Sequence, residues 1–388
     1  MTVAGSWTLT EQVLLGVMAA VWLYQLYFYF RFILAAVRRT KGTQTTQGKE
    51  ETDTSSLPGV SVIVCAKNEE VNLRDYLQAL MTQDYPVFEV IVVNDGSVDN
   101  TELFLDYWQK RYSNLKLTFV PQGARVGSTK KLAITLGAKA AQYDYLLLTD
   151  ADCRPESTRW IREMMSGFRS PETQIVLGAG MYFRKRGLLN RLVQFDTLFT
   201  ALQYLGLAAC GYPYMGVGRN LAYRKQLFFE HGGFVGLMNN RAGDDDLFVN
   251  REATTTNTTV VCTPESLTWS VPKLRWRDWF RQKRRHLSVA TKYKASTRLQ
   301  LLLEPLTRGV LYAMLIALLV LGTWQTQLIA LTAMLLRWIA QCVLMNTAAD
   351  RWGTTKIILL IPVWEILLPL VTLVLMLIEP LRPKPTRW

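Results

Sequence analysis

The chain has 388 residues, 49% of them hydrophobic, and its 44 Lys and Arg outnumber 31 Asp and Glu to give a formal charge of +13. A nucleic-acid binder would also be basic, but ten of these cations lie between Lys273 and Arg298, interleaved with Trp276, Trp279 and Phe280. Cations mixed with aromatic side chains before apolar segments are typical of a membrane surface, so we expect a membrane partner and no nucleic acid. The five Cys form no CxxC pair and are expected to be reduced core residues.

The first predicted element is a membrane helix. Val13 to Phe30 carries no charge and is close to the ~20 residues that a bilayer requires. A cleaved signal peptide would have basic residues before the apolar run, but none occurs from Met1 to Gln12. Arg38, Arg39 and Lys41 follow the run instead, so the positive-inside rule predicts an external N-terminus and a cytoplasmic domain.

A polar stretch up to residue 57 is expected to link this helix to a soluble domain. From residue 58 onward, short apolar runs alternate with segments whose apolar residues recur at helical spacing. This alternation predicts an α/β domain with a mostly parallel sheet, which binds ligands at the carboxyl ends of its strands. The predicted strands are Val60–Cys65, Phe88–Val93, Leu115–Val120 and Tyr143–Leu148, and the predicted helices are Val71–Met81 and Lys130–Ala141.

Three apolar segments come last, and their topology stays open. They are residues 310–324, 328–345 and 357–378. Three complete crossings would place the tail outside, yet the tail carries three cations, which favour the cytoplasm. Either the tail is an exception or one segment does not cross. The first segment is short, and the last contains Pro362, Glu365 and Pro369.

Three groups of carboxylates occur within the soluble domain. Asp95 follows the second predicted strand, Asp150 and Asp152 follow the fourth, and three Asp occupy positions 244–246. Carboxylates at strand ends can hold a ribose and a divalent metal, and Mg²⁺ and Mn²⁺ prefer oxygen ligands. Each group also has a structural explanation, as turn residues for the first two and as a helix N-terminus for the third.

Five segments in this order resemble the membrane-bound family-2 glycosyltransferases, relatives of ceramide glucosyltransferase and of cellulose, chitin and hyaluronan synthases. They are SVIVCAKNEE, VVNDGS, LLLTDADC, GDDDL and QKRRH, and the resemblance extends from Pro58 to about Leu299. It implies a nucleotide-diphospho-sugar transferase (GT-A) fold with a Rossmann-like mixed sheet, flanked here by transmembrane helices. The implied division is a membrane helix (1–37), a linker (38–57), a cytoplasmic catalytic domain (58–271), a basic interface segment (272–307), membrane segments (308–379) and a basic tail (380–388).

The resemblance also implies the donor site and its metal. Asp95 is expected to bind the base, Asp150 the nucleoside or the metal, and Asp152 the metal, which would be Mg²⁺ or Mn²⁺. Lys67 replaces an aromatic residue that many members have. Further donor contacts are expected from Ala66, Glu69, Lys130 and Arg285, although a solvated helix Lys explains Lys130 nearly as well.

Asp245 takes the place of the catalytic base by the same resemblance. An inverting transfer needs a base that removes the acceptor's proton, and a neighbouring carboxylate raises the proton affinity of that base. Asp244 is expected to hold the acceptor, and Asp246 has no assigned role.

The acceptor side departs from the family pattern. Gln282 and Arg285 match its Gln-x-x-Arg-Trp motif, but His286 replaces the Trp. Gly218, within GVGRN, is a small residue where a sugar can approach the backbone. The apolar segment that begins at Phe195 is either an interface helix near a lipid acceptor or part of the core.

These observations favour an inverting glycosyltransferase that moves a sugar from a nucleotide diphosphate to a lipid or lipid-linked glycan. A UDP-sugar is the first choice of donor, and a GDP-sugar is the second. The altered motif and the few membrane segments make processive polysaccharide synthesis the second choice. A non-catalytic scaffold would not need the intact acids. A channel or transporter, suggested by Arg337 and Glu365, leaves the soluble domain unexplained. We expect those two charges to pair within the membrane, because an isolated charge there is costly.

Overall fold

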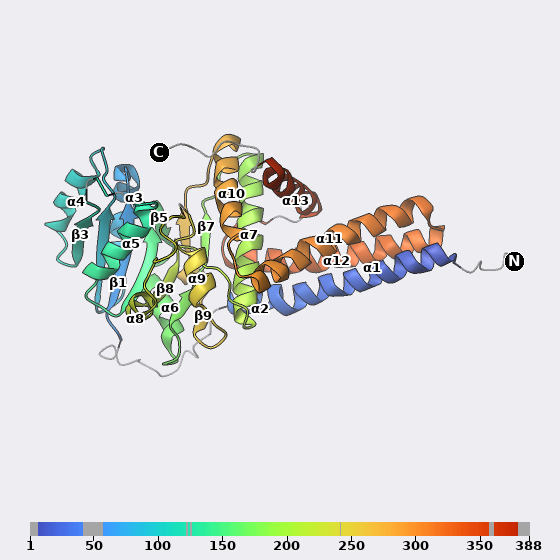
Figure 1. The fold of residues 1–388 in the computed structure, drawn as a ribbon, viewed down its shortest axis with the longest axis horizontal. Helices are drawn as coiled ribbons and strands as arrows, with labels where there is room; N and C mark the ends of the chain where they lie inside the picture. The colour runs from blue at the N-terminus through green and yellow to red at the C-terminus, as the bar shows by residue number, and fades with distance from the viewer. Residues whose placement is uncertain are drawn as a thin grey trace.

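The computed structural model describes residues 7–41, 57–121, 123–124, 126–240, 242–356 and 361–378. An α/β domain is joined to an elongated bundle of long helices (Figure 1). The predicted linker lies mostly outside the described residues, and the basic tail lies wholly outside them.

The α/β domain is built on a seven-stranded sheet of order β3-β2-β1-β4-β8-β6-β9. The strands from β3 to β4 are parallel, whereas β8 runs antiparallel to both β4 and β6, so the sheet is mixed as predicted. The four strands predicted from apolar runs are present, with ends that differ by at most two residues. The bounds are β1 Val60–Ala66, β2 Phe88–Asn94, β3 Leu115–Phe119, β4 Tyr145–Asp150, β6 Ile175–Leu177, β8 Leu221–Arg224 and β9 Thr258–Val260.

Helices cover both faces of this sheet because successive side chains of a strand point to opposite sides. Val62 and Val64 of β1 are buried in one cluster with residues of α3, α4 and α6, while Ile63 is buried in another cluster with residues of α5. Gly137 allows α5 to approach closely, since a Cβ there would stand 2.7 Å from Ile63 Cγ2. Both predicted helices are confirmed. The bounds are α3 Glu70–Met81, α4 Thr101–Gln109, α5 Thr129–Ala140, α6 Trp160–Met165 and α8 Lys225–Glu230.

A second, three-stranded sheet extends from the end of β4. It consists of β5 (Cys153–Pro155), β10 (Thr268–Ser270) and β7 (Gly180–Tyr182), in that order. Helix α7 (Leu188–Ala209) follows, and most of its side chains are buried. The segment that begins at Phe195 therefore belongs to the core.

Helix α7 also packs against the C-terminal end of the first predicted membrane helix. That helix runs as α1 (Leu9–Phe28), a π-helical turn η1 (Tyr29–Ile33) and α2 (Leu34–Arg39). Gly206 permits the contact, because a Cβ there would lie 2.1 Å from the carbonyl oxygen of Phe32.

Three of the described helical segments are long and apolar enough to cross a membrane: Leu9–Arg39, Ala295–Leu321 (α11) and Trp324–Arg351 (α12). The last apolar helix, α13 (Ile361–Ile378), is shorter in its described apolar part. It lies at the base of the bundle, near α7 and α10 (Trp276–Ala290), rather than along the bundle (Figure 1).

The predicted ion pair between Arg337 and Glu365 is confirmed. The guanidinium donates to both carboxylate oxygens at 2.8 and 3.1 Å, and neither side chain is exposed. Gln25 Oε1 accepts two further bonds from Arg337, at 3.1 and 2.9 Å. The ion pair thus joins α12 to α13, and the hydrogen bonds from Arg337 to Gln25 connect α1 to the same pair.

Candidate active site

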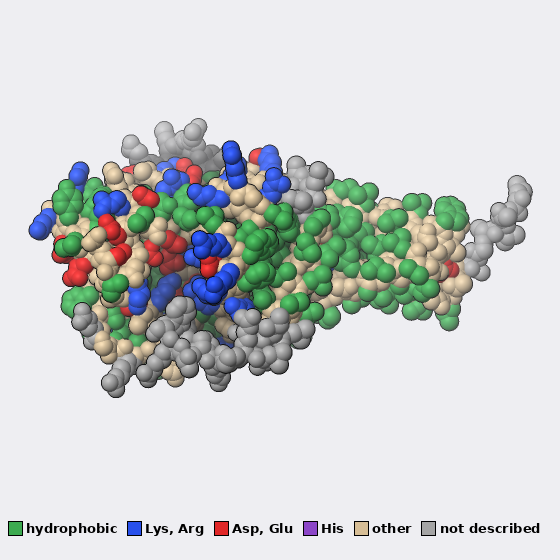
Figure 2. All heavy atoms as spheres, turned by 90° about the horizontal axis from the view of Figure 1, so that it is seen from above, with side chains coloured by type: hydrophobic (Ala, Val, Ile, Leu, Met, Phe, Trp, Pro, Cys, Tyr) green, Lys and Arg blue, Asp and Glu red, His purple; other side chains and the backbone are tan. Residues whose placement is uncertain are grey.

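The chain brings its three acidic groups to the carboxyl edge of the parallel strands. Asp150 is the last residue of β4, Asp95 follows β2, and Asp152 lies between β4 and β5. Asp245 is the N-cap of the short helix α9 (Asp246–Glu252). Figure 2 shows acidic side chains gathered in a hollow of the domain, with Lys and Arg side chains beside it and the apolar bundle beyond.

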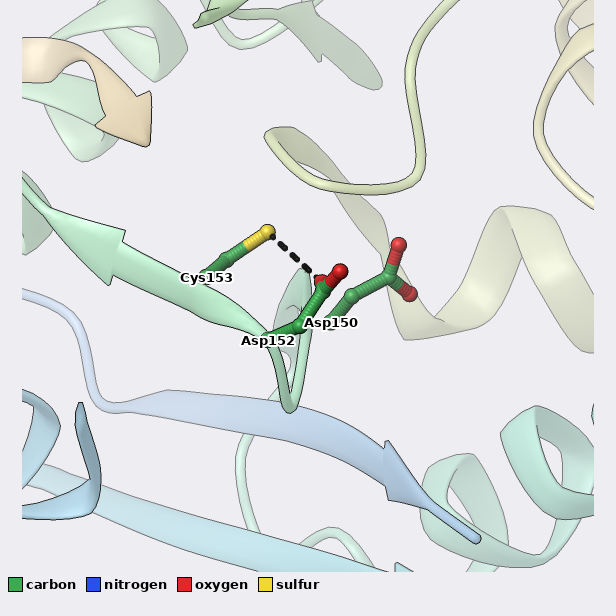
Figure 3. Close-up of side chains that lie close together, drawn as sticks. All are labelled: Asp150, Asp152 and Cys153. Carbon is green, nitrogen blue, oxygen red and sulfur yellow. Dashed lines mark hydrogen bonds between the residues drawn. The ribbon is translucent and has the colours of Figure 1, made fainter. Parts of the chain in front are cut away.

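Asp150, Asp152 and Cys153 have potential ligand atoms within 4.8 Å of one another (Figure 3). Ser270 Oγ donates to Asp152 at 3.0 Å, and the Cys153 thiol contacts the same carboxylate at 3.4 Å. Burial raises the pKa of the Cys153 thiol. Sulfur is also a soft ligand, whereas Mg²⁺ and Mn²⁺ prefer oxygen. Two carboxylates remain, a donor set that fits Mg²⁺ or Mn²⁺.

Lys130 of α5 joins this pair to the third acidic group. Its Nζ lies 2.9 Å from Asp150 Oδ1 and 3.1 Å from Asp244 Oδ2. Desolvation acts against the ammonium, but the carboxylates of Asp150 and Asp244 outweigh it and raise the pKa of Lys130 well above its usual range. The cation therefore stays charged between the predicted metal ligands and the predicted base.

Asp245 and Asp244 are neighbours with opposite pKa shifts. Burial and then the charge of Asp244 raise the pKa of Asp245. Burial would raise that of Asp244 too, but Lys130 overcomes it and lowers the pKa of Asp244. One carboxylate is therefore held ionised while the other gains proton affinity, the division of roles that a general base beside a binding carboxylate requires.

Backbone donors fix the Asp245 carboxylate. Gly218 N–H donates to Oδ2 at 2.6 Å, and Asp246 N–H donates to Oδ1 at 2.8 Å. The sequence allowed GDDDL to be either a helix N-terminus or part of the site, and both apply, because Asp245 caps α9 and also lines the site. A Cβ on Gly218 would lie 3.3 Å from Asp245 Oδ2, so Gly218 contacts the predicted base directly.

Asp246 faces different surroundings. One of its oxygens is buried without a hydrogen-bond partner, and the side chain interacts with Tyr293. Burial, followed by the charges of Asp245 and Asp244, raises the pKa of Asp246 well above its usual range. Asp245 lines the cavity beside Lys130 and Asp150 whereas Asp246 does not, so Asp246 is a poorer candidate for the base.

The residues expected to contact the nucleoside gather at the ends of β1 and β2. Ala66 pairs with the residue before Asp95, and its carbonyl accepts from Asp95 N–H at 2.8 Å. The Asp95 carboxylate accepts from Thr129 Oγ1 at 2.5 Å and lies 3.6 Å from Lys67 Nζ. Lys67, which replaces an aromatic residue, thus supplies a cation here. Burial raises the pKa of Glu69.

Helix α10 presents the Gln-x-x-Arg-His segment. Gln282 Nε2 donates to the Tyr182 hydroxyl at 2.9 Å, while Arg285 is exposed and forms no ion pair with any described residue. Desolvation, followed by the charges of Arg285 and Lys283, lowers the pKa of His286. Because solvent still reaches the ring, we attribute the shift chiefly to those charges, and the imidazole is neutral near pH 7.

Arg219 is the site residue that sequence reasoning missed. Its guanidinium donates to the carbonyls of Gly180 and Met181 at 3.1 and 3.3 Å and lies over the Tyr182 ring at 4.4 Å. Against desolvation, Tyr182, Cys153 and the site carboxylates raise the pKa of Arg219 further. The signal available in the sequence was an Arg directly after Gly218.

A family model described as Glycosyl transferase family 21 matches residues 20–378. The probable glycosyltransferase YdaM of Bacillus subtilis (strain 168) is 24% identical over 272 residues, covering 69% of this chain and 63% of that protein. A poly-beta-1,6-N-acetyl-D-glucosamine synthase of Staphylococcus epidermidis is 31% identical over 153 residues, covering 39% of this chain and 34% of that protein. The chain therefore spans less than two thirds of either relative.

One solved structure has a similar fold over nearly the whole chain. It is the mannosyltransferase PcManGT from Pyrobaculum calidifontis in complex with GDP-Man and Mn²⁺. Its TM-score is 0.56 at 20% identity, and the match covers 89% of this chain and 99% of that one. At this identity the similarity concerns the fold alone, and the predicted GT-A fold is confirmed.

Proposed function

The chain belongs to glycosyl transferase family 21, and we propose that it moves a sugar from a UDP-sugar to a lipid or lipid-linked glycan at the cytoplasmic face of a membrane. The observation that carries this proposal is the placement of Lys130 between Asp150 and Asp244. The predicted donor carboxylates and the predicted base thereby line one site, beside helices able to cross a bilayer.

In the proposed reaction, the acceptor oxygen bonds to the anomeric carbon as the bond from that carbon to the diphosphate breaks. Asp245 takes the acceptor's hydroxyl proton, and the donors Gly218 N–H and Asp246 N–H hold its carboxylate in place. The departing nucleoside diphosphate carries the electron pair. Arg285, exposed and without an ion pair to any described residue, offers two parallel hydrogen bonds to phosphate.

A divalent metal fits the same mechanism. Asp150 and Asp152 would hold the ion, which when bound neutralises charge on the diphosphate. PcManGT binds Mn²⁺ together with a nucleotide sugar, which supports this assignment for a chain of the same fold. That complex contains GDP-Man, so a GDP-sugar is the second choice of donor here.

The topology belongs to the proposal as well. Cations after the first membrane helix favour a cytoplasmic catalytic domain. With α11 and α12 crossing and α13 lying at the membrane surface, the tail returns to the cytoplasm, where its cations are favoured.

The test supplies membranes containing the full chain with labelled UDP-Glc, UDP-GlcNAc and GDP-Man, and identifies the labelled product. An organic-soluble product supports a lipid acceptor. A large water-soluble polymer would favour the alternative, processive synthesis, which the similarity to the staphylococcal synthase suggests.

Asp245→Asn should lower transfer ~10²–10⁴-fold with donor binding retained. Asp106→Asn, at an exposed position on α4, is the matched control. Near-normal transfer by Asp245→Asn would contradict the assignment of the base.

A further inference from the structure

A groove of about 540 Å³ lies where the first membrane helix meets the α/β domain, away from the predicted catalytic residues. Its walls come from α1, the loop after α7, the end of α9 and the start of α11. A volume of several hundred Å³ is typical of small-molecule sites.

The two sides of the groove differ in chemistry. Aromatic rings from the membrane helix, including Tyr24 and Tyr27, form one side. Lys294, Ser296 and Thr297 contribute an ammonium and two hydroxyls to the other. Lys294 is the one charged residue lining the groove among those described, so negative charge entering the groove meets a cation and no carboxylate. Lys294 is also the N-cap of α11, where the helix dipole favours an anion.

The position of the groove indicates what can enter it. Tyr24 and Tyr27 belong to one candidate span, and Leu303, also in the lining, belongs to another. The end of α1 and the start of α11, which line the groove, adjoin the domain (Figure 1). Tyr side chains commonly mark the lipid headgroup level at such a position. Tyr27 and Leu303 are partly exposed, so apolar chains can lie against them.

The groove is separate from the predicted acceptor position. Asp245 lies at the start of α9, whereas Asn250 and the residues after the helix line the groove. The seven residues of α9 span about 10 Å. The rings of Tyr214 and Tyr293, whose centroids are 5.9 Å apart, pack at this junction, and Tyr293 interacts with Asp246. We therefore expect a headgroup at Lys294 to lie apart from the predicted base.

We propose that this groove binds a membrane phospholipid in addition to the acceptor, with the phosphate at Lys294 and the acyl chains along Tyr27 and Leu303. Binding there also stabilises the junction between α9 and α11. Asn250 accepts from Lys294 N–H at 2.9 Å and donates to the Tyr214 carbonyl at 3.0 Å. A phosphate bound at Lys294 thus stabilises the C-terminal end of α9, whereas Asp245 lies at the N-terminal end of the same helix.

The test measures lipid binding without activity. Purified full-length protein in detergent is titrated with phosphatidylglycerol or with diacylglycerol of the same chains, and native mass spectrometry counts the bound lipid. We expect saturable binding of phosphatidylglycerol alone. Lys294→Gln should weaken it about tenfold through loss of one charged contact. Arg298→Gln, an exposed cation on the same helix that does not line the groove, should not.

A second pair of variants tests whether a large side chain inside the groove blocks lipid binding. Gln300→Trp places an indole in the groove, whereas Leu299→Trp places an indole at an exposed position that does not line it. Only the first should abolish phosphatidylglycerol binding, and equal melting temperatures establish that both fold. Equal binding by all four variants would overturn the proposal. Competition between phosphatidylglycerol and the glycosyl acceptor, with a raised acceptor KM for Gln300→Trp, would also overturn it by assigning the groove to the acceptor.

Discussion

Replacing Arg337 and Glu365, singly and together, tests whether their ion pair fastens α13 to the bundle. Both side chains are fully buried and share two hydrogen bonds of 2.8 and 3.1 Å. Removal of one partner from such a pair leaves an uncompensated charge and costs about 3–5 kcal/mol, whereas replacement of both by apolar residues is often nearly neutral.

The remaining contacts predict different losses for the two single variants. Glu365→Leu leaves Arg337 with Gln25 Oε1 as its remaining side-chain acceptor among the described residues, and a guanidinium cannot lose its proton. Arg337→Leu leaves Glu365 with donors from Tyr312 and from Trp338, the latter at 2.8 Å, and a carboxylate can take up a proton. We therefore expect about 5 kcal/mol for Glu365→Leu and about 3 kcal/mol for Arg337→Leu.

The assay is the free energy of unfolding of the full chain in mixed micelles, measured by titration with a denaturing detergent. The double variant should be more stable than either single variant, which gives a coupling energy of at least about 5 kcal/mol. The exposed pair Arg281–Asp278, at 3.6 Å, is the control and should couple by about 1 kcal/mol or less. Additive losses at Arg337 and Glu365 would refute the reasoning, because they would mean that the two charges are stabilised independently.

Three further outcomes follow from the site. Asp152→Asn should remove Mn²⁺-dependent UDP binding, measured by calorimetry, without changing the melting temperature; unchanged binding would contradict the metal assignment. Because burial and then Asp244 raise the pKa of Asp245, and a base acts when ionised, transfer should fall as pH drops through that raised pKa. Asp244→Asn removes the neighbouring charge and should move this acidic limb to lower pH, so a fixed limb would count against Asp245. Gly218→Ala should lower kcat while leaving UDP affinity unchanged, since its methyl would press on Asp245, whereas Gly309→Ala, in open space, should change neither.

The sequence predicted those elements that have a clear hydrophobic period. Strands β1 and β2 are runs of buried aliphatic residues, and α3 and α5 carry apolar residues at helical spacing, so their ends were placed within a residue or two. Strands of three residues, such as β6 and β9, are too short to show a period. Their pairing, and the antiparallel position of β8 between β4 and β6, depend on tertiary contacts.

The same limit applies to the site. Aspartates at strand ends were found because β4 places Asp150 at the sheet edge, and Asp152 follows two residues later. The bridge made by Lys130 depends on how α5 packs beside the loop before α9, and no spacing along the chain encodes that distance. Arg219 was not predicted as a site residue for the same reason. Its neighbours Gly180, Met181 and Tyr182 belong to the three-stranded sheet and are distant along the chain.

The packing between bundle and domain constrains how an acceptor reaches Asp245. Helix α7 contacts η1 through Gly206, Arg351 donates to the Val37 carbonyl at 2.7 Å, and the Trp352 indole donates to the Cys262 carbonyl at 2.8 Å. The contact of η1 with α7 and the bond from Trp352, directly after α12, to Cys262 therefore hold the domain at a fixed height relative to the bundle, while the Arg351–Val37 bond joins α12 to α2. A domain on a loose tether could search for acceptors at varying distances from the bilayer. For the lipid-linked acceptor proposed above, the hydroxyl would have to lie at the height set by these contacts, so we expect the length of the polar group between lipid and hydroxyl to determine specificity.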